Sequence, residues 1–131
     1  MGAAKRPVIL YVEDDPDTRD LVQKALKSLY EVVALSYGEG TPDMAKAYSP
    51  DLIILDVGLP GISGYQVCRD LRDTPETRRI TILFLTAFSG EEAFSEGLAA
   101  GCDSWMNKPI DVAELLQRVA CMLKESNRIS G

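Results

Sequence analysis

The chain has 131 residues, which suits one domain with a single hydrophobic core. Its formal net charge of −6 argues against nucleic-acid binding by this domain, because contacts to phosphates require a basic face. The chain contains no histidine, which excludes a histidine general base, a histidine metal ligand and a phosphohistidine of its own.

Short apolar runs typical of strands alternate along the chain with stretches that carry helix signals. In chain order the expected elements are a strand at 8–12, a helix at 14–29, a strand at 31–35, a helix at 41–48, a strand at 51–55, a helix at 64–72, a strand at 80–86, a helix at 90–101, a strand at 104–107 and a helix at 111–125. We expect Thr41 to cap the second helix, with Pro42 in its first turn, and Gly101 to end the fourth.

This alternation predicts an α/β fold with a doubly wound, five-stranded parallel sheet, covered on both faces by helices through right-handed crossovers. In such sheets ligands bind beyond the carboxyl ends of the strands, where the strand order switches. Residues directly after a strand are therefore the first candidates for a functional site.

Acidic, hydroxyl and basic residues stand at the ends of four of the five expected strands. In chain order they are Glu13, Asp14 and Asp15 after the first, Asp56 after the third, Thr86 at the fourth and Lys108 after the fifth. Two carboxylates ~4 Å apart repel by roughly 4 kcal/mol at an effective dielectric of 20, so such a cluster needs a cation. Carboxylates without His or Cys suit Mg²⁺, and a lysine with a hydroxyl would hold phosphoryl oxygens. The pattern predicts a metal-assisted phosphoryl group on an aspartate.

Four segments, VILYVEDD, DLIILDVGLPGISG, ITILFLTA and WMNKP, together resemble the response-regulator receiver domain of two-component signalling, over residues 8–124. The resemblance implies the (βα)5 flavodoxin-like fold, Mg²⁺ as cofactor and Asp56 as the phosphoacceptor. It also implies that Asp14 binds Mg²⁺ directly, that Glu13 acts mostly through water, and that the carbonyl of Gly58 is a backbone metal ligand.

The resemblance assigns two further residues to the phosphoryl group. Thr86 resembles the switch hydroxyl and Lys108 the phosphate-binding lysine, followed by Pro109, which in the family is frequently cis. Trp105 stands where the family usually has Tyr or Phe, and that ring normally turns inward when the hydroxyl moves to the phosphoryl group. Asp15 lies just outside the motif and is interpreted as a helix cap or as a charge behind the metal ligands.

The implied function is a switch that receives a phosphoryl group on Asp56 from a histidine kinase or a histidine phosphotransfer protein. It catalyses only its own phosphorylation and dephosphorylation, so we do not expect an enzyme. One alternative is a phosphohydrolase of the haloacid-dehalogenase type, which needs a second aspartate two residues after the nucleophile, where this chain has Gly58. The other is a receiver-like interaction module without phosphorylation. It is disfavoured by the complete set of Glu13, Asp14, Asp56, Thr86 and Lys108.

We expect an N-terminal tail at residues 1–7, the receiver domain at 8–124, and a C-terminal tail or the start of a linker at 125–131, with no output domain in the chain. In the family, the face made by the helix at 90–101, the strand that contains Trp105 and the final helix usually changes on phosphorylation. We expect that face to bind a second copy or a downstream protein.

The sequence gives no sign of export. No apolar run approaches the roughly 20 residues that cross a bilayer, and the segment MGAAKRP lacks the apolar core of a signal peptide. The three cysteines, Cys68, Cys102 and Cys121, have no metal-ligand spacing, and an odd count favours free thiols in a reducing compartment. We therefore expect a cytoplasmic protein without membrane contact.

Overall fold

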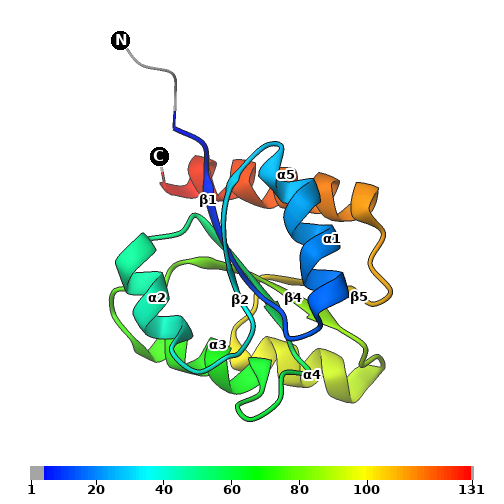
Figure 1. Cartoon of the computed structure of the whole chain (residues 1–131). Coiled ribbons are helices and arrows are strands. Elements are labelled where there is room, and N and C mark those ends of the chain that lie inside the picture. Colours follow the sequence, from blue (N-terminus) through cyan, green and yellow to red (C-terminus); the bar gives the residue numbers. More distant parts are fainter. Residues whose placement is uncertain (1–4, 131) are drawn as a thin grey trace.

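The computed structural model describes the backbone of residues 5–130 and the side chains of residues 5–126. The strands form one parallel sheet in the order β2-β1-β3-β4-β5 (Figure 1). They are β1 (Val8–Val12), β2 (Glu31–Leu35), β3 (Leu52–Asp56), β4 (Thr81–Thr86) and β5 (Ser104–Asn107). The helices are α1 (Pro16–Lys27), α2 (Thr41–Tyr48), α3 (Gly64–Asp73), α4 (Glu91–Ala100) and α5 (Val112–Ser130). The predicted doubly wound α/β fold is confirmed.

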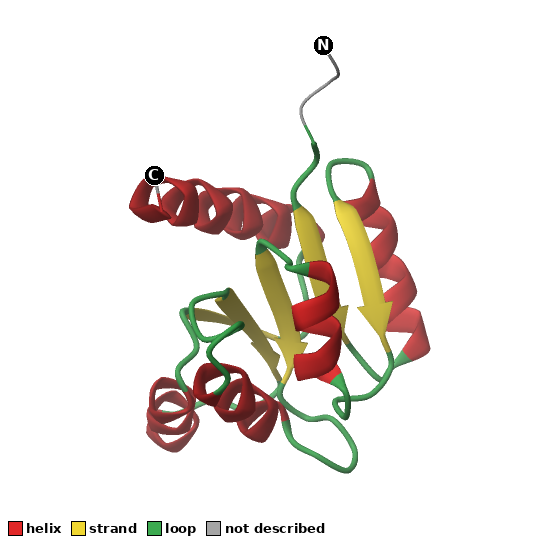
Figure 2. Ribbon diagram, turned by 90° about the vertical axis from the view of Figure 1, so that its left-hand side faces the viewer, coloured by secondary structure: helices red, strands yellow, loops and turns green. Residues whose placement is uncertain are grey.

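The helices divide between the two faces of the sheet. Helices α1 and α5 contact each other on one face, and α3 contacts both α2 and α4 on the other (Figures 1 and 2). The arrowheads of the strands all point to the same edge of the sheet (Figure 2). The order switches between β1 and β3, so the segments after these two strands meet at the crevice where ligands bind in this class of fold.

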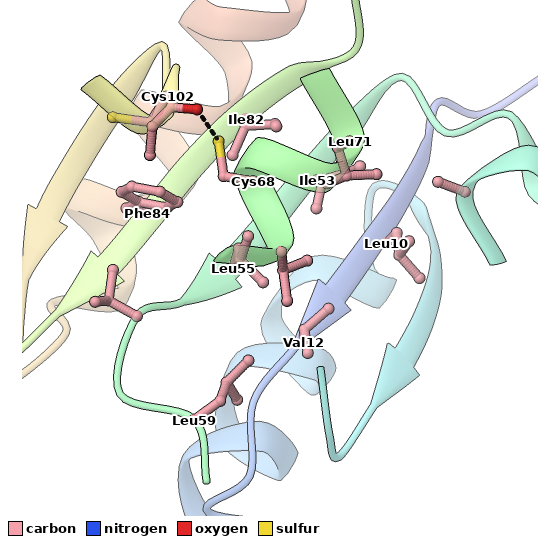
Figure 3. Close-up of a cluster of buried hydrophobic side chains, with 14 residues drawn as sticks. Leu10, Val12, Ile53, Leu55, Leu59, Cys68, Leu71, Ile82, Phe84 and Cys102 are labelled. Atoms are coloured by element: carbon pink, nitrogen blue, oxygen red, sulfur yellow. Dashed lines mark hydrogen bonds between the residues drawn. The ribbon is translucent and has the colours of Figure 1, made fainter. Parts of the chain in front are cut away.

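Successive side chains of a strand point to opposite faces, and the central strands are therefore apolar at every position. Leu10 of β1 and Leu55 of β3 belong to the hydrophobic cluster under α2, α3 and α4, which Figure 3 shows together with Leu71 of α3. Ile9 and Ile54, one position away, belong to the cluster under α1 and α5. This double core holds the ends of β1 and β3 in fixed positions.

The ends of the helices test the expected capping residues. Asp15 caps α1, because its carboxylate accepts a hydrogen bond from the Thr18 N–H at 2.9 Å. Of the two interpretations of Asp15, the helix cap is therefore confirmed. The prediction that Thr41 caps α2 is wrong, because the cap is the preceding residue. Gly40, at φ +84°, is the N-cap of α2, and the buried hydroxyl of Thr41 finds no hydrogen-bond partner among the described residues. Gly101 ends α4 at φ +100°, as predicted.

The final helix is longer than expected, whereas the cysteines agree with the prediction. The sequence predicts the end of this helix near residue 125, but α5 continues through Ser130, so its backbone is helical across most of the expected tail. The expected N-terminal tail lies partly outside the described residues. The three cysteines are free thiols, as predicted, and Cys68 and Cys102 are buried whereas Cys121 is exposed.

Candidate functional site

Asp56 is the last residue of β3 and is almost fully buried at the edge where the strands end. One carboxylate oxygen, Oδ1, accepts a hydrogen bond from the backbone N–H of Gly58 at 3.1 Å. The start of α3 packs so closely on this segment that a Cβ at Gly64 would come within 2.5 Å of the backbone oxygen of Asp56. The segment between Asp56 and α3 therefore holds the Asp56 carboxylate in place, with its oxygens at the crevice beyond the strand ends.

Glu13 and Asp14 follow β1 at the same edge. Glu13 is fully buried, accepts a hydrogen bond from the Asp15 N–H at 3.3 Å, and lies 3.5 Å from the Tyr11 hydroxyl. The guanidinium of Arg19, from the first turns of α1, donates to the backbone carbonyls of Glu13 at 2.9 Å and of Asp14 at 3.3 Å. These contacts fix the backbone that presents the two acidic side chains.

Glu13, Asp14 and Asp56 form one group, which we call the carboxylate cluster. Each residue offers an oxygen, and these oxygens all lie within 4.8 Å of one another. Asp14 is the most accessible of the three, and it therefore offers a ligand on the solvent side.

Lys108 reaches the carboxylate cluster from the segment after β5. Its ammonium nitrogen lies 3.1 Å from Oε1 of Glu13 and 3.2 Å from Oδ2 of Asp56. Its backbone N–H donates to the carbonyl of Thr86 at 2.8 Å, and the peptide bond to Pro109 is cis. The structure therefore brings together four of the residues singled out in the sequence, although they come from three separate segments.

The electrostatics of the site show that negative charge is in excess. Burial, reinforced by the hydrogen bond and the charge of Asp56, raises the pKa of Glu13 to about 7, although Lys108 opposes the shift. Burial alone would lower the pKa of Lys108, but its hydrogen bond to Glu13 and the charge of Asp56 raise it overall, so the ammonium stays charged.

The donor set fits a divalent cation. When ionised, three carboxylates beside one ammonium leave two formal negative charges, which is the charge that one divalent cation would neutralise. All the candidate ligand atoms are hard oxygens, as Mg²⁺ prefers, and Asp14 provides an open side on which a metal could keep waters. The carboxylate cluster can therefore hold Mg²⁺.

Thr86 and Trp105 lie beside the carboxylate cluster rather than in it. In the sheet register Asp56 is opposite Leu85, so Thr86 is one residue further along the same edge. Its hydroxyl oxygen accepts a hydrogen bond from the Phe88 N–H at 2.9 Å. The half-buried Trp105 ring packs edge-to-face on Phe94 of α4, with centroids 4.8 Å apart and planes at 86°.

Two contributors were missed in the sequence. Arg19 had a usable signal, because a cation in the first turns of a helix opposes the helix dipole and needs a compensating contact elsewhere. Phe94 had none, because its contact with Trp105 joins a helix to a strand and follows from no local pattern.

Residues 9–120 match the family model described as the response regulator receiver domain. The chain therefore belongs to the receiver-domain family of two-component response regulators, which act in phosphorelay signal transduction.

Individual relatives agree with this assignment. The chain is 38% identical over 124 residues to the DNA-binding dual master transcriptional regulator RpaA of Synechocystis sp., covering 94% of the chain and 52% of RpaA. It is 39% identical over 121 residues to the phosphate regulon transcriptional regulatory protein PhoB of Rhizobium meliloti, covering 92% of the chain and 53% of PhoB. The chain thus spans about half the length of these two regulators.

Solved structures give the same result. The receiver domain of a signal transduction histidine kinase from Syntrophus aciditrophicus superposes with a TM-score of 0.83 at 30% identity, over 91% of each chain. The BeF3-activated receiver domain of DrrB has a TM-score of 0.78 at 32% identity, over 91% of this chain and 98% of that one.

In the described part of the chain, no helix combines the length and the apolar character needed to cross a membrane.

Proposed function

We propose that this domain is a switch that accepts a phosphoryl group on Asp56 from a histidine kinase or a histidine phosphotransfer protein. The observation that carries the proposal is the position of Lys108, whose ammonium nitrogen lies 3.2 Å from one oxygen of Asp56 while the Gly58 N–H binds the other oxygen at 3.1 Å. Residues 1–131 contain no histidine, so the donor histidine lies outside this domain.

In this proposal an oxygen of Asp56 attacks the phosphorus of the donor's phosphohistidine. A P–O bond forms, the P–N bond breaks, and its electron pair goes to the imidazole nitrogen. Lys108 then pairs with the phosphoryl oxygens instead of with the bare carboxylate. Hydrolysis of the acyl phosphate by water returns Asp56 to its original state, so the domain turns over no separate substrate and is not classed as an enzyme.

Mg²⁺ would be held by the carboxylates of Asp14 and Asp56 and by the backbone carbonyl of Gly58, with Glu13 acting mostly through water. When bound, the ion supplies positive charge to the phosphoryl oxygens. Arg19 contributes indirectly, because it fixes the two backbone carbonyls of the segment that presents Glu13 and Asp14.

The switch itself involves Thr86, whose hydroxyl hydrogen can turn to a phosphoryl oxygen because the hydroxyl oxygen acts as the acceptor for the Phe88 N–H. Movement of Thr86 would free space beside Trp105, whose ring then turns inward. The face of α4, β5 and α5 would change with it and bind a second copy or a downstream protein. We propose that residues 8–124 form this unit, that it acts in the cytoplasm, and that it makes no direct contact with nucleic acid or a membrane.

The test is phosphorylation by acetyl phosphate followed by intact-mass measurement. The wild-type domain should gain one phosphoryl group, and only with Mg²⁺ present. Asp56→Asn should gain none, whereas Asp73→Asn, which changes an exposed aspartate at the end of α3, should behave as the wild type. Undiminished incorporation in Asp56→Asn would rule out the assignment of the phosphoacceptor.

A further inference from the structure

A pocket of about 200 Å³ lies between the segment after β4, helix α4 and strand β5. Its lining is unusually aromatic for this chain, which contains nine aromatic residues in total. All three phenylalanines and the only tryptophan line it, together with one tyrosine, namely Tyr65, Phe84, Phe88, Phe94 and Trp105. We call this space the aromatic pocket.

We propose that the aromatic pocket binds a small one- or two-ring aromatic molecule that carries a hydrogen-bonding group and no negative charge. Rings of this kind pack edge-to-face or offset against aromatic walls. The size is appropriate, because in another protein an apolar cavity of about 150 Å³ holds benzene. A peptide helix, about 10 Å across with its side chains, would not fit in the volume.

The polar requirement follows from the remaining lining. Thr86 and Asn107 border the aromatic pocket, and the Thr86 hydroxyl can still donate its hydrogen because its oxygen serves as an acceptor. Asn107 is fixed in place, since its side-chain N–H donates to the Phe88 carbonyl at 2.8 Å. A hydroxyl oxygen on the ligand could therefore accept a hydrogen bond from Thr86, and a hydroxyl or N–H group could donate one to the side-chain amide oxygen of Asn107.

The charge requirement follows from α4, which carries Glu91, Glu92 and Glu96 and no basic residue. The charge of Glu96 contributes, after burial, to the raised pKa of Tyr65, so this glutamate lies close to the wall of the aromatic pocket. An aromatic carboxylate would be repelled there, whereas a phenol or an indole would not.

Phe94 and Trp105, whose rings could otherwise move into the aromatic pocket, are packed against each other. Phe94 and Trp105 pack edge-to-face at 4.8 Å, and Phe94 is about half exposed, with a relative exposure of 47%. A small ligand can thus occupy the aromatic pocket while this pair of rings stays in contact.

The consequence for signalling rests on the proposed function. The ligand and an inward Trp105 ring would compete for the same volume, so each should weaken the other. Because such coupling is reciprocal, a domain saturated with Mg²⁺ and beryllofluoride should bind the ligand more weakly than the resting domain.

Titration of the isotope-labelled domain with phenol tests the binding site, since the Trp105 indole N–H gives a single identifiable resonance. We expect a saturable shift for phenol, and neither cyclohexanol, which lacks the ring electrons, nor benzoate, which carries a negative charge, should reproduce it. A linear, non-saturating response to phenol, or equal responses to all three compounds, would overturn the proposal.

Variants of α4 locate the site. Ala93→Leu enlarges a side chain that lines the aromatic pocket and should weaken phenol binding by on the order of tenfold, because the added carbons and the phenol ring would occupy the same space. Ala99→Leu adds the same side chain at an exposed position of α4 outside the pocket and should bind as the wild type. Wild-type affinity in Ala93→Leu would overturn the assignment.

A gentler variant covers the case in which Ala93→Leu does not fold. A Cβ at Gly97 would meet Cys102 Sγ at 3.5 Å and the ring of Phe84 at 3.8 Å, which are ordinary contacts, so Gly97→Ala should fold and narrow the pocket. It too should weaken phenol binding, and unchanged binding would count against the site.

The two proposals can fail separately. If acetyl phosphate labels Asp56 but phenol does not bind, the aromatic pocket is not a ligand site and the proposed function stands. If phenol binds Asp56→Asn as tightly as it binds the wild type, the site stands without any phosphorylation. If beryllofluoride and Mg²⁺ bind but leave the phenol affinity unchanged, the coupling is overturned.

Discussion

The carboxylate cluster and the aromatic pocket lie at the same edge of the sheet but are built in opposite ways. In the carboxylate cluster, backbone N–H groups and Lys108 bind the oxygens of Glu13 and Asp56, and Arg19 fixes the adjacent carbonyls. The aromatic pocket instead has open volume and half-exposed rings. A fixed polar site suits chemistry, whereas a loosely filled apolar site can change shape at little cost. Thr86 lies between the two regions.

The largest effect should come from replacing Lys108, whose ammonium group is the positive charge beside the carboxylate cluster. In metal-free buffer near neutral pH, Lys108→Met leaves Glu13 and Asp56 without their partner and should destabilise the fold by about 3 kcal/mol. Denaturant unfolding measures this change. Lys124→Met, at an exposed position of α5, is the matched control and should have little effect. A loss in Lys108→Met no larger than in the control would show that the cluster does not need a fixed cation.

The next effect concerns the metal. Because Mg²⁺ binds only the assembled site, a hundredfold excess over its dissociation constant should stabilise the wild type by ~2.7 kcal/mol. Asp14→Asn should be more stable than the wild type without metal, since one repelling charge is gone, and should lose the Mg²⁺ increment. Asp17→Asn, an exposed aspartate in α1, should keep the increment. A full increment in Asp14→Asn would remove Asp14 from the metal site.

Stability of the metal-free domain should also depend on pH through Glu13. The pKa of this carboxyl rises from 4.5 to about 7 in the folded state, so the folded state binds the proton more tightly than the unfolded state. The stabilisation that this tighter proton binding gives to the folded state is complete below pH 4.5 and is lost as the pH rises through about 7. Acidification from about pH 8 to about pH 6 should therefore stabilise the domain by about 1 kcal/mol relative to Glu13→Gln. Parallel pH profiles of the two melting temperatures would contradict this.

Much of the carboxylate cluster could be predicted from the sequence, because strand ends in a parallel α/β sheet converge on one edge whatever the packing details. The apolar run before Asp56 and the short strand before Lys108 were enough to bring both residues there. The fold followed from the same alternation of strands and helices. The bounds of α2 were predicted correctly, but its cap was assigned to Thr41 instead of Gly40, because the two neighbours compete for the capping position and only the backbone conformation decides between them.

The aromatic pocket could not be predicted in the same way. Whether Phe94 contacts Trp105 depends on the rotation of α4 about its axis and on its distance from the sheet, and neither follows from a periodic pattern. Gly97 contributes by its lack of a side chain, which leaves room beside Phe84. The sequence indicated Trp105 as an unusual residue but gave no sign of the space beside it.

The smallest predicted effect links the two regions through Thr86. Mg²⁺ with beryllofluoride, which imitates the phosphoryl group on Asp56, should draw the Thr86 hydroxyl away from its contact with the Phe88 N–H. The half-buried indole of Trp105 would then leave Phe94 and enter the aromatic pocket, because the phosphoryl mimic binds that state better. Trp105 is the only tryptophan, so its emission should shift to shorter wavelength and acrylamide quenching should fall. Thr86→Ala should keep beryllofluoride binding and lose most of the shift. Emission and quenching that stay constant at saturation would mean that the indole does not move, and that the signal leaves the carboxylate cluster without an aromatic rotation.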